Sequence, residues 1–291
     1  MPPRALDLPS LPRLLYEDAV RRALREDLGL AGDITTDAIV PPDAAATGCI
    51  VARAPGRIAG LQVAVSAFLE LDPGCQVQIA LADGSDAAAG DRLVTLQGRA
   101  RTLLTAERTA LNFLGRLCGI ATATRGVVAA IAPHRAQVVC TRKTTPGLRA
   151  LEKYAVRAGG GSNHRFGLDD AVLVKDNHRA LAGSLSEAVS RIRGSVGHMV
   201  KVEVEVDTLE QLEEALRLEI DAVLLDNMTP GQLVQAVRMA KGKVITEASG
   251  GITPETAAAV AATGVDLLSI GWLTHSAPSL DVSLDVVQSG C

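Results

Sequence analysis

Residues 201–227 read KVEVEVDTLEQLEEALRLEIDAVLLDN. The valines of VEVEV alternate with glutamates, which is typical of a strand with one apolar face. The segment TLEQLEEALRL that follows has apolar residues at helical spacing, and AVLL forms a second short apolar strand. A strand, a helix and a strand of these lengths predict a βαβ unit with parallel strands.

The same alternation continues over the chain from about residue 119. Short apolar strands are predicted at QVVC, AVLV, VEVEV, AVLL, KVIT and DLLSI, which begin at residues 137, 171, 202, 222, 243 and 266. Helical stretches such as TPGQLVQAVRMA separate them, and no GxGxxG motif follows the first strand, which argues against a dinucleotide-binding sheet. Because these strands are fewer than a full barrel needs, we expect an α/β fold with an irregular or incomplete (TIM-like) α/β barrel over residues 119–272.

Residues 1–118 mix element types and predict a small separate α+β unit. Helices are expected at 14–28, 63–71 and 101–117, strands at 47–54, 75–81 and 92–98, and a loop at 32–44, where GDITTDAIVPPDA is rich in Asp, Thr and Pro. The stretch LDVSLDVVQSG near the C-terminus alternates like a strand or a short helix. We expect it to pack back on this first unit.

The composition limits the classes of function. The chain has 291 residues, a formal net charge of -4 and 47% hydrophobic residues, enough for one large or two ordinary domains. Mild acidity and only 2% aromatic residues argue against a nucleic-acid partner. The five cysteines lack CxxC spacing, which favours reduced thiols, and no apolar run reaches the length of a membrane span. We therefore expect a cytoplasmic protein without a membrane partner.

Charged and glycine-rich residues follow the predicted barrel strands, where α/β barrels place their active sites. In chain order these strand ends carry Thr141-Arg142-Lys143, Lys175-Asp176-Asn177-His178, Glu205 with Asp207, Asp226-Asn227, Glu247 to Gly251, and Ser269-Ile270-Gly271. The glycine-rich segment GGGSNHRFG adds His164 and Arg165.

This distribution of charge predicts a ligand with several negative charges. The adjacent Arg142 and Lys143 repel each other unless an anion lies between them, and arginine grips a carboxylate in bidentate fashion. Carboxylates beside a phosphate group suggest Mg²⁺. Ser249-Gly250-Gly251 has the form of a phosphate-binding turn, although an ordinary strand-to-helix turn explains the same residues.

The strand KVEVEV predicts charges inside the barrel. Because its valines suit the interface with the helices, Lys201, Glu203 and Glu205 should face the interior, where a charge is costly unless it is paired. For Lys201 and Glu203 an internal ion pair is a sufficient explanation. For Glu205, nearest the strand end, a ligand or metal contact and a structural ion pair are equally good interpretations.

Longer blocks of sequence resemble the quinolinate phosphoribosyltransferase family. The blocks are LLTAERTALNFLGRLCGIAT, TRKTTPGLRALEKYAVRAGGGSNHRFGL, VKDNH, VEVEV, LLDN, EASGGIT and SIGWLTHS. The resemblance runs from REDLG near residue 25 to residue 276, and TRKTTPG and KDNH make it specific. It implies an N-terminal α/β sandwich domain completed by the C-terminal tail 273–291, followed by an irregular barrel.

The resemblance also implies a reaction, a cofactor and a set of site residues. Quinolinate and phosphoribosyl pyrophosphate would give nicotinate mononucleotide, pyrophosphate and CO2 with Mg²⁺, in a homodimer or higher homo-oligomer. The implied catalytic residues are Lys143, Lys175, Glu205 and Asp226, of which Glu205 and Asp226 would face Mg²⁺ and the ribose. The implied quinolinate pocket is Thr141, Arg142, Lys143, His164, Arg165 and Lys175, with Arg108 from a neighbouring subunit. The implied 5'-phosphate site is Ser249, Gly250, Gly251, Ile270, Gly271 and Trp272.

Single residues keep simpler interpretations. Many members of the family have Asp where this chain has Cys140, and a small buried residue explains Cys140 better than a nucleophile does. His134 and His198 are expected in loops or on the surface, and His178 caps the turn after KDN or belongs to the site.

Three other functions fit part of the pattern. A related phosphoribosyltransferase acting on another nitrogen heterocycle would share most of the site. An aldolase-like lyase would form a Schiff base on Lys175 or Lys143. A non-catalytic protein that binds a phosphorylated ligand would bind tightly and release no pyrophosphate.

Overall fold

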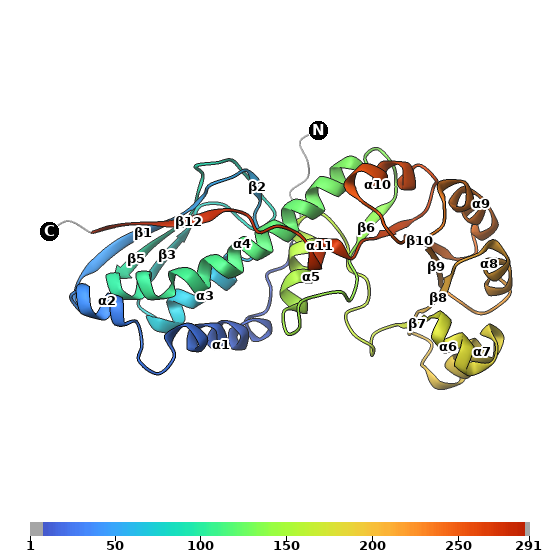
Figure 1. The fold of residues 1–291 in the computed structure, drawn as a ribbon, viewed down its shortest axis with the longest axis horizontal. Helices are drawn as coiled ribbons and strands as arrows, with labels where there is room; N and C mark the ends of the chain where they lie inside the picture. The colour runs from blue at the N-terminus through green and yellow to red at the C-terminus, as the bar shows by residue number, and fades with distance from the viewer. Residues whose placement is uncertain (1–7, 289–291) are drawn as a thin grey trace. The chain divides into compact units, whose positions relative to one another are not determined.

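The computed structural model describes residues 8–288, which form two compact units (Figure 1). The first unit groups the described residues of 1–125, 144–160 and 273–291, and the second groups 126–143 and 161–272. The chain therefore leaves the first unit and returns to it twice. The predicted domain boundary after residue 118 falls inside the long helix α4 (Ala100–Ala130).

The first unit is built on a four-stranded antiparallel sheet. Its strand order is β12-β1-β5-β3. The strands are β1 (Ala45–Ala52), β3 (Gln76–Ile79), β5 (Arg92–Arg99) and β12 (Val282–Gln288). Ile50 of β1 lies opposite Leu284 of β12, so the tail packs back on this unit as a strand. A second small sheet pairs β2 (Gly56–Arg57) with β4 (Asp86–Ala87).

Helices complete the sandwich of the first unit. They are the short η1 (Arg13–Leu15), α1 (Glu17–Leu28), α2 (Ile34–Ile39), α3 (Leu61–Leu71), α4 and α5 (Arg149–Ala158). A Cβ added at Gly48 of β1 would lie 3.4 Å from Leu103 of α4, so this helix packs directly on the sheet.

The predicted loop at 32–44 is wrong in its middle, where helix α2 forms. Asp33 caps this helix, because its side chain accepts a hydrogen bond from the backbone N–H of Thr36 at 2.9 Å. Asp33 also accepts a bond from Thr105 of α4 at 3.0 Å. A capping residue before a helix of six residues is a weak signal for a helix, and the prolines at 41 and 42 favour a loop.

Helix α4 is longer than the predicted 101–117. The helix continues through Gly119, where a Cβ would lie 2.0 Å from the carbonyl oxygen of Pro278. Gly119 therefore allows the C-terminal tail to approach the helix closely and does not end it.

The second unit is a six-stranded parallel sheet in the order β6-β11-β10-β9-β8-β7, with β6 and β7 at its ends. The strands are β6 (Gln137–Val139), β7 (Val172–Val174), β8 (Val202–Val206), β9 (Ala222–Asp226), β10 (Ile245–Ser249) and β11 (Leu267–Ser269). All six predicted strands are present, and the open order agrees with the expected irregular barrel. Strand β10 runs to Ser249, which corrects the predicted end at Thr246.

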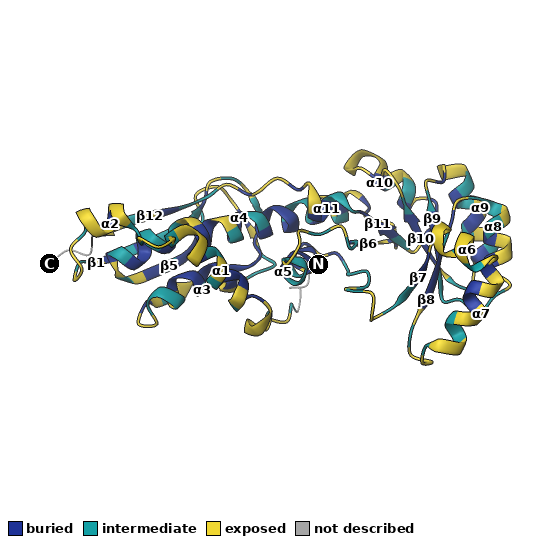
Figure 2. Ribbon diagram, turned by 60° about the horizontal axis from the view of Figure 1, so that its bottom comes forward, coloured by how far each residue is buried: buried dark blue, intermediate teal, exposed yellow. Residues whose placement is uncertain are grey.

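Helices connect these strands along one side of the sheet (Figure 1). They are α6 (Asp176–Ala182), α7 (Leu185–Ser195), α8 (Leu209–Ala215), α9 (Pro230–Ala240) and α10 (Pro254–Ala261), and the short α11 (Trp272–His275) follows the last strand of the sheet. Figure 2 shows buried residues where these helices meet the sheet and exposed residues on their outer sides. Within residues 8–288 no helix has both the length and the apolar character needed to cross a membrane.

Strand β8 shows how the sheet places charge inside. Val202, Val204 and Val206 are fully buried, and Glu203 and Glu205 lie on the other face. The inward position expected for Lys201 is wrong, and so is its possible pairing with Glu203, because Lys201 precedes the strand and binds Asp221 at 2.7 Å. Glu203 pairs with His164 instead, at 2.9 Å.

Candidate functional site

A cavity of about 410 Å³ lies at the C-terminal ends of the parallel strands of the second unit. Its lining residues are Thr141, Arg142, Lys143, His164, Arg165, Leu173, Lys175, Glu205, Leu224, Asp226, Ser249 and Ser269. Nine of the residues predicted for the site are therefore brought together here. The strands position them as parallel sheets do, because every strand of the sheet ends at the same edge.

Two arginines share this cavity. The buried Nε of Arg142 has no hydrogen-bond partner among the described residues. Arg165 donates from Nη1 to the carbonyl oxygen of Ala171 at 3.0 Å. Burial, and after it the neighbouring Arg142, lower the pKa of Arg165 below its usual value, while Asp170 and Glu203 act in the opposite direction. An anion bound between the two guanidinium groups would offset both the desolvation cost of the charged arginine and the repulsion between the two charges.

Lys175 and Glu205 form an ion pair across neighbouring strand ends. Lys175 Nζ lies 2.7 Å from Glu205 Oε2, and the lysine side chain is 47% exposed. The backbone N–H of Lys175 donates to His178 Nδ1 at 3.0 Å, so His178 caps helix α6, the simpler of its two interpretations. The pair holds the ammonium group of Lys175 at the cavity wall.

Asp226 is the second carboxylate of the cavity. Its Oδ2 accepts a hydrogen bond from Asn227 Nδ2 at 2.7 Å. Together with Glu205 it faces four cationic side chains in the lining, those of Arg142, Lys143, Arg165 and Lys175. With His164 neutral, the lining has an excess of two positive charges, which favours a ligand with several negative charges.

The turn after β10 depends on glycine. Gly250 has φ +96°, and a Cβ there would lie 2.1 Å from Asn227 Oδ1. The backbone N–H of Asn227 donates to the carbonyl oxygen of Ser249 at 2.9 Å, which ties the ends of β9 and β10 together. Trp272 Nε1 donates to the carbonyl oxygen of Ile252 at 2.9 Å and connects this loop to α11. These hydrogen bonds tie the turn to β9 and α11, and the turn directly follows a lining residue, Ser249.

Within residues 8–288, the other predicted site residues do not line this cavity. They are Gly250, Gly251, Ile270, Gly271 and Trp272, on the loops after β10 and β11, and Arg108. Arg108 is exposed on α4 in the first unit, where it lines a separate hollow of about 470 Å³ with Asn112 and Asp281.

Cys140 and Thr141 follow directly after β6, where the TRKTTPG block begins. Thr141 Oγ1 accepts a hydrogen bond from the backbone N–H of Lys143 at 3.0 Å. Cys140 is fully buried, and its thiol lies 3.3 Å from Asn163 Oδ1. This agrees with a small buried residue at a strand end.

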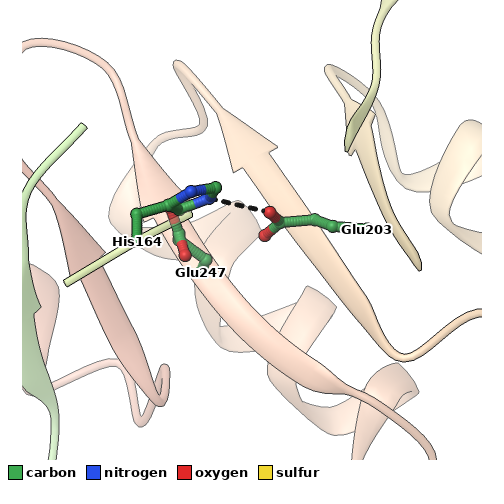
Figure 3. A group of neighbouring side chains, drawn as sticks. All are labelled: His164, Glu203 and Glu247. Carbon is green, nitrogen blue, oxygen red and sulfur yellow. Dashed lines mark hydrogen bonds and ion pairs between the residues drawn. The ribbon is translucent and has the colours of Figure 1, made fainter. Parts of the chain in front are cut away.

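The sequence reasoning missed a buried cluster next to the cavity (Figure 3). His164 Nε2 lies 2.9 Å from Glu203 Oε2 and 3.5 Å from Glu247 Oε1. Glu247 was assigned to a loop because β10 was predicted to end too early. Alternation along the strand ITEAS, which places Glu247 and Ser249 on one face, would have found it.

The apolar part of the lining was also missed. Leu173 of β7 and Leu224 of β9 line the cavity beside the charged groups. They point inward in strands that read as continuous apolar runs, so no alternation marked them. Their side chains offer a surface suited to a flat ring.

Comparison with known proteins gives a consistent result for both units. Residues 33–118 match the N-terminal domain of quinolinate phosphoribosyl transferase, and residues 120–285 match its C-terminal domain. The nicotinate-nucleotide pyrophosphorylase [carboxylating] of Mycobacterium leprae is 47% identical over 274 residues, 92% of this chain and 96% of that protein. The probable enzyme of the same name from Bacillus subtilis is 45% identical over 264 residues, 91% of each chain.

The fold agrees with these sequence matches. The crystal structure of NadC from Streptococcus pyogenes superimposes with a TM-score of 0.93 at 40% identity, covering 97% of this chain and 100% of that one. The two domain matches together span most of the chain, and the relatives match it nearly end to end. The chain therefore belongs to the quinolinate phosphoribosyltransferase family.

Proposed function

We propose that this protein transfers the phosphoribosyl group of phosphoribosyl pyrophosphate to quinolinate and decarboxylates the product, giving nicotinate mononucleotide, pyrophosphate and CO2. The reaction is that named for its relatives, and it belongs to NAD biosynthesis. The observation that carries the proposal is the half-buried pair Arg142 and Arg165 in a cavity with excess positive charge. Quinolinate has two adjacent carboxylates, which such a pair can hold.

The chemistry follows from holding the two substrates in line. The pyridine nitrogen forms a bond to the anomeric carbon of the ribose while the bond from that carbon to pyrophosphate breaks. Developing positive charge on the ribose makes position and electrostatics more important than a protein nucleophile. Of the lining groups, Glu205 and Asp226 are the carboxylates that can face this charge.

CO2 is lost in the second step. The electron pair of the broken C–C bond stays on the ring carbon next to the alkylated nitrogen, whose positive charge stabilises it, and that carbon then takes up a proton from solvent. Arg142 and Arg165 hold the carboxylates, with Lys143 and Lys175 in the same cationic lining. Leu173 and Leu224 offer the ring an apolar contact.

The residues present fit a magnesium ion. Glu205 and Asp226 end neighbouring strands and line one cavity, and one or two carboxylates with waters and substrate oxygens are the usual protein share of such a site. When bound, Mg²⁺ neutralises charge on the pyrophosphate group. The glycine turn at Gly250 and Gly251, with Ser249, Ile270, Gly271 and Trp272, would hold the 5'-phosphate through backbone groups.

A pyrophosphate-release assay tests the function. Quinolinate, phosphoribosyl pyrophosphate and Mg²⁺ should give equal amounts of pyrophosphate, CO2 and nicotinate mononucleotide. Nicotinate in place of quinolinate should give almost none, because only one carboxylate would meet the two arginines. Equal release with nicotinate would indicate a phosphoribosyltransferase for another heterocycle, and no release with either would contradict the proposal.

The lyase alternative has less support from the structure. The amine of Lys175 is engaged in the ion pair with Glu205 at 2.7 Å and is not free to attack a carbonyl carbon. Borohydride trapping of a carbonyl substrate on Lys175 or Lys143 would favour that alternative.

The active assembly is proposed to be a cytoplasmic homodimer, or a higher oligomer built from dimers, in which Arg108 reaches the quinolinate of a neighbouring subunit. The support is the family membership together with the exposure of Arg108 on α4. In a closed twofold dimer the exchange is reciprocal, so each dimer has two composite sites.

Mixing of two inactive variants tests this exchange. Arg108→Ala and Arg165→Ala should each be nearly inactive, but a hybrid dimer would carry both changes in one site and none in the other. After subunit exchange the activity should recover to about a quarter of wild type, since half of the dimers have one intact site of two. Native mass spectrometry checks that hybrids form, and hybrids without recovered activity would show that Arg108 acts within its own subunit or not at all.

A further inference from the structure

Both ring nitrogens of His164 are occupied by the protein itself. The backbone N–H of Arg165 donates to Nδ1 at 2.8 Å. Nε2 lies 2.9 Å from Glu203 Oε2 (Figure 3). The side chain is only 13% exposed, although the residue contributes to the cavity lining.

These contacts determine the tautomer of the ring. A backbone N–H can only donate, so Nδ1 must be the unprotonated acceptor, and Nε2 carries the proton that it donates to Glu203. A ring in this state has no lone pair on Nε2 for a metal ion. The cluster of His164, Glu203 and Glu247, whose ligand atoms lie within 4.8 Å of one another, is therefore better explained by hydrogen bonding than by metal binding.

The same contacts fix the residue next to His164. Arg165 is held at its backbone by Nδ1 of His164 and at its guanidinium group by the carbonyl oxygen of Ala171, at 3.0 Å. Glu203 and Glu247, in turn, lie inside β8 and β10, with β9 between them, and both are buried. The ring is thus anchored to two buried strand residues of the sheet, while Arg165 lies on an irregular loop.

We propose that His164 is a positioning residue, which links the loop carrying Arg165 to the buried Glu203 and so orients the guanidinium group for a substrate carboxylate. It donates no proton to the substrate, because its one N–H is directed to Glu203. This inference rests on the proposed function for the identity of the substrate, but the ring contacts are independent of it.

Two variants separate positioning from proton transfer. In His164→Asn the amide oxygen replaces Nδ1 and can still accept from the Arg165 N–H, whereas His164→Leu removes both hydrogen bonds. His164→Asn should raise the KM for quinolinate about 3- to 10-fold and leave kcat within about threefold, because one bond of ordinary strength is lost. His164→Leu should raise that KM about 10- to 100-fold. The matched control is His198→Asn, an exposed histidine of the same unit.

The kinetic result can overturn the proposal in two ways. A fall of kcat by more than about 100-fold in His164→Asn, with KM unchanged, would show that the ring transfers a proton. An unchanged KM in a folded His164→Leu would show that the ring positions nothing.

A spectroscopic measurement decides the matter without turnover. In ¹⁵N-histidine-labelled wild type without substrate, the His164 ring should be the Nε2–H tautomer, identified by the signal that disappears in His164→Asn. An Nδ1–H tautomer or a doubly protonated ring would overturn the proposal. This measurement stands even if His164→Leu does not fold, and even if the wild type fails to use quinolinate, a result that would overturn the proposed function alone.

Discussion

Replacing Arg142 or Arg165 by alanine should weaken quinolinate binding by about 2–5 kcal/mol, which is about 30-fold to about 5,000-fold in the dissociation constant. A substrate carboxylate would then be buried without its partner, and that loss is larger than the loss of one exposed ion pair. Binding of phosphoribosyl pyrophosphate should change much less. Calorimetry with each ligand separately measures both effects.

Although Arg142→Ala should weaken quinolinate binding, it should not lower the stability of the ligand-free protein. Arg142 has a buried Nε without a partner among the described residues, and it contributes to the lowered pKa of Arg165. Removing it relieves a like-charge repulsion and an unsatisfied donor, so Arg142→Ala should unfold at the same temperature as wild type or a higher one. A variant that binds quinolinate weakly and is no less stable would show that the arginine pair is maintained for the ligand.

An exposed arginine of the second unit provides the control. Arg217 pairs with Glu213 one helical turn away, and its side chain is 71% exposed. Arg217→Ala should leave the binding of both ligands unchanged. Equal losses for quinolinate and phosphoribosyl pyrophosphate in Arg142→Ala or Arg165→Ala would contradict the assignment of these arginines to the carboxylates.

The sheet of the second unit could be predicted because its signals are local. Each strand is a short apolar run between helices. In VEVEV the alternation of valine and glutamate predicts which face of the strand is charged. The strand ends then collect Arg142, Lys175 and Asp226 at one edge without any knowledge of distant contacts. The resemblance of the TRKTTPG and KDNH blocks to a family added the chemistry that periodicity cannot supply.

What could not be predicted depends on partners far apart in the sequence. His164 and Glu203 are 39 residues apart, and only the packed sheet brings them together. Gly119 inside helix α4 leaves space for the tail at Pro278, a contact that no local pattern contains. Lys201 was expected to face inward with Glu203, but it lies outside the strand, where Asp221 was the nearer partner.

The two carboxylates of the cavity differ in what their removal should do. Glu205 neutralises Lys175 at 2.7 Å, so Glu205→Gln also leaves a lysine without its charge partner. Asp226 accepts its hydrogen bond from the neutral Asn227, and an asparagine at position 226 can still accept that bond. Asp226→Asn therefore removes one negative charge and keeps the hydrogen bond. Glu205→Gln also frees the charge of Lys175, so it should increase the attraction of the cavity for anions while it weakens a metal site.

Both variants should reduce the apparent affinity for Mg²⁺ by about 10- to 100-fold, the range found when groups that hold or orient metal ligands are changed. Titration of Mg²⁺ in the pyrophosphate-release assay at saturating quinolinate and phosphoribosyl pyrophosphate measures this shift. Quinolinate binding should be equal or tighter in both variants, since each removes a carboxylate that repels the substrate. Asp207→Asn is the matched control, because Asp207 is an exposed carboxylate at the same strand end as Glu205 and is not among the described lining residues. A normal magnesium dependence in both variants would mean that Glu205 serves only to hold Lys175 and that Asp226 serves only to order the turn at Asn227.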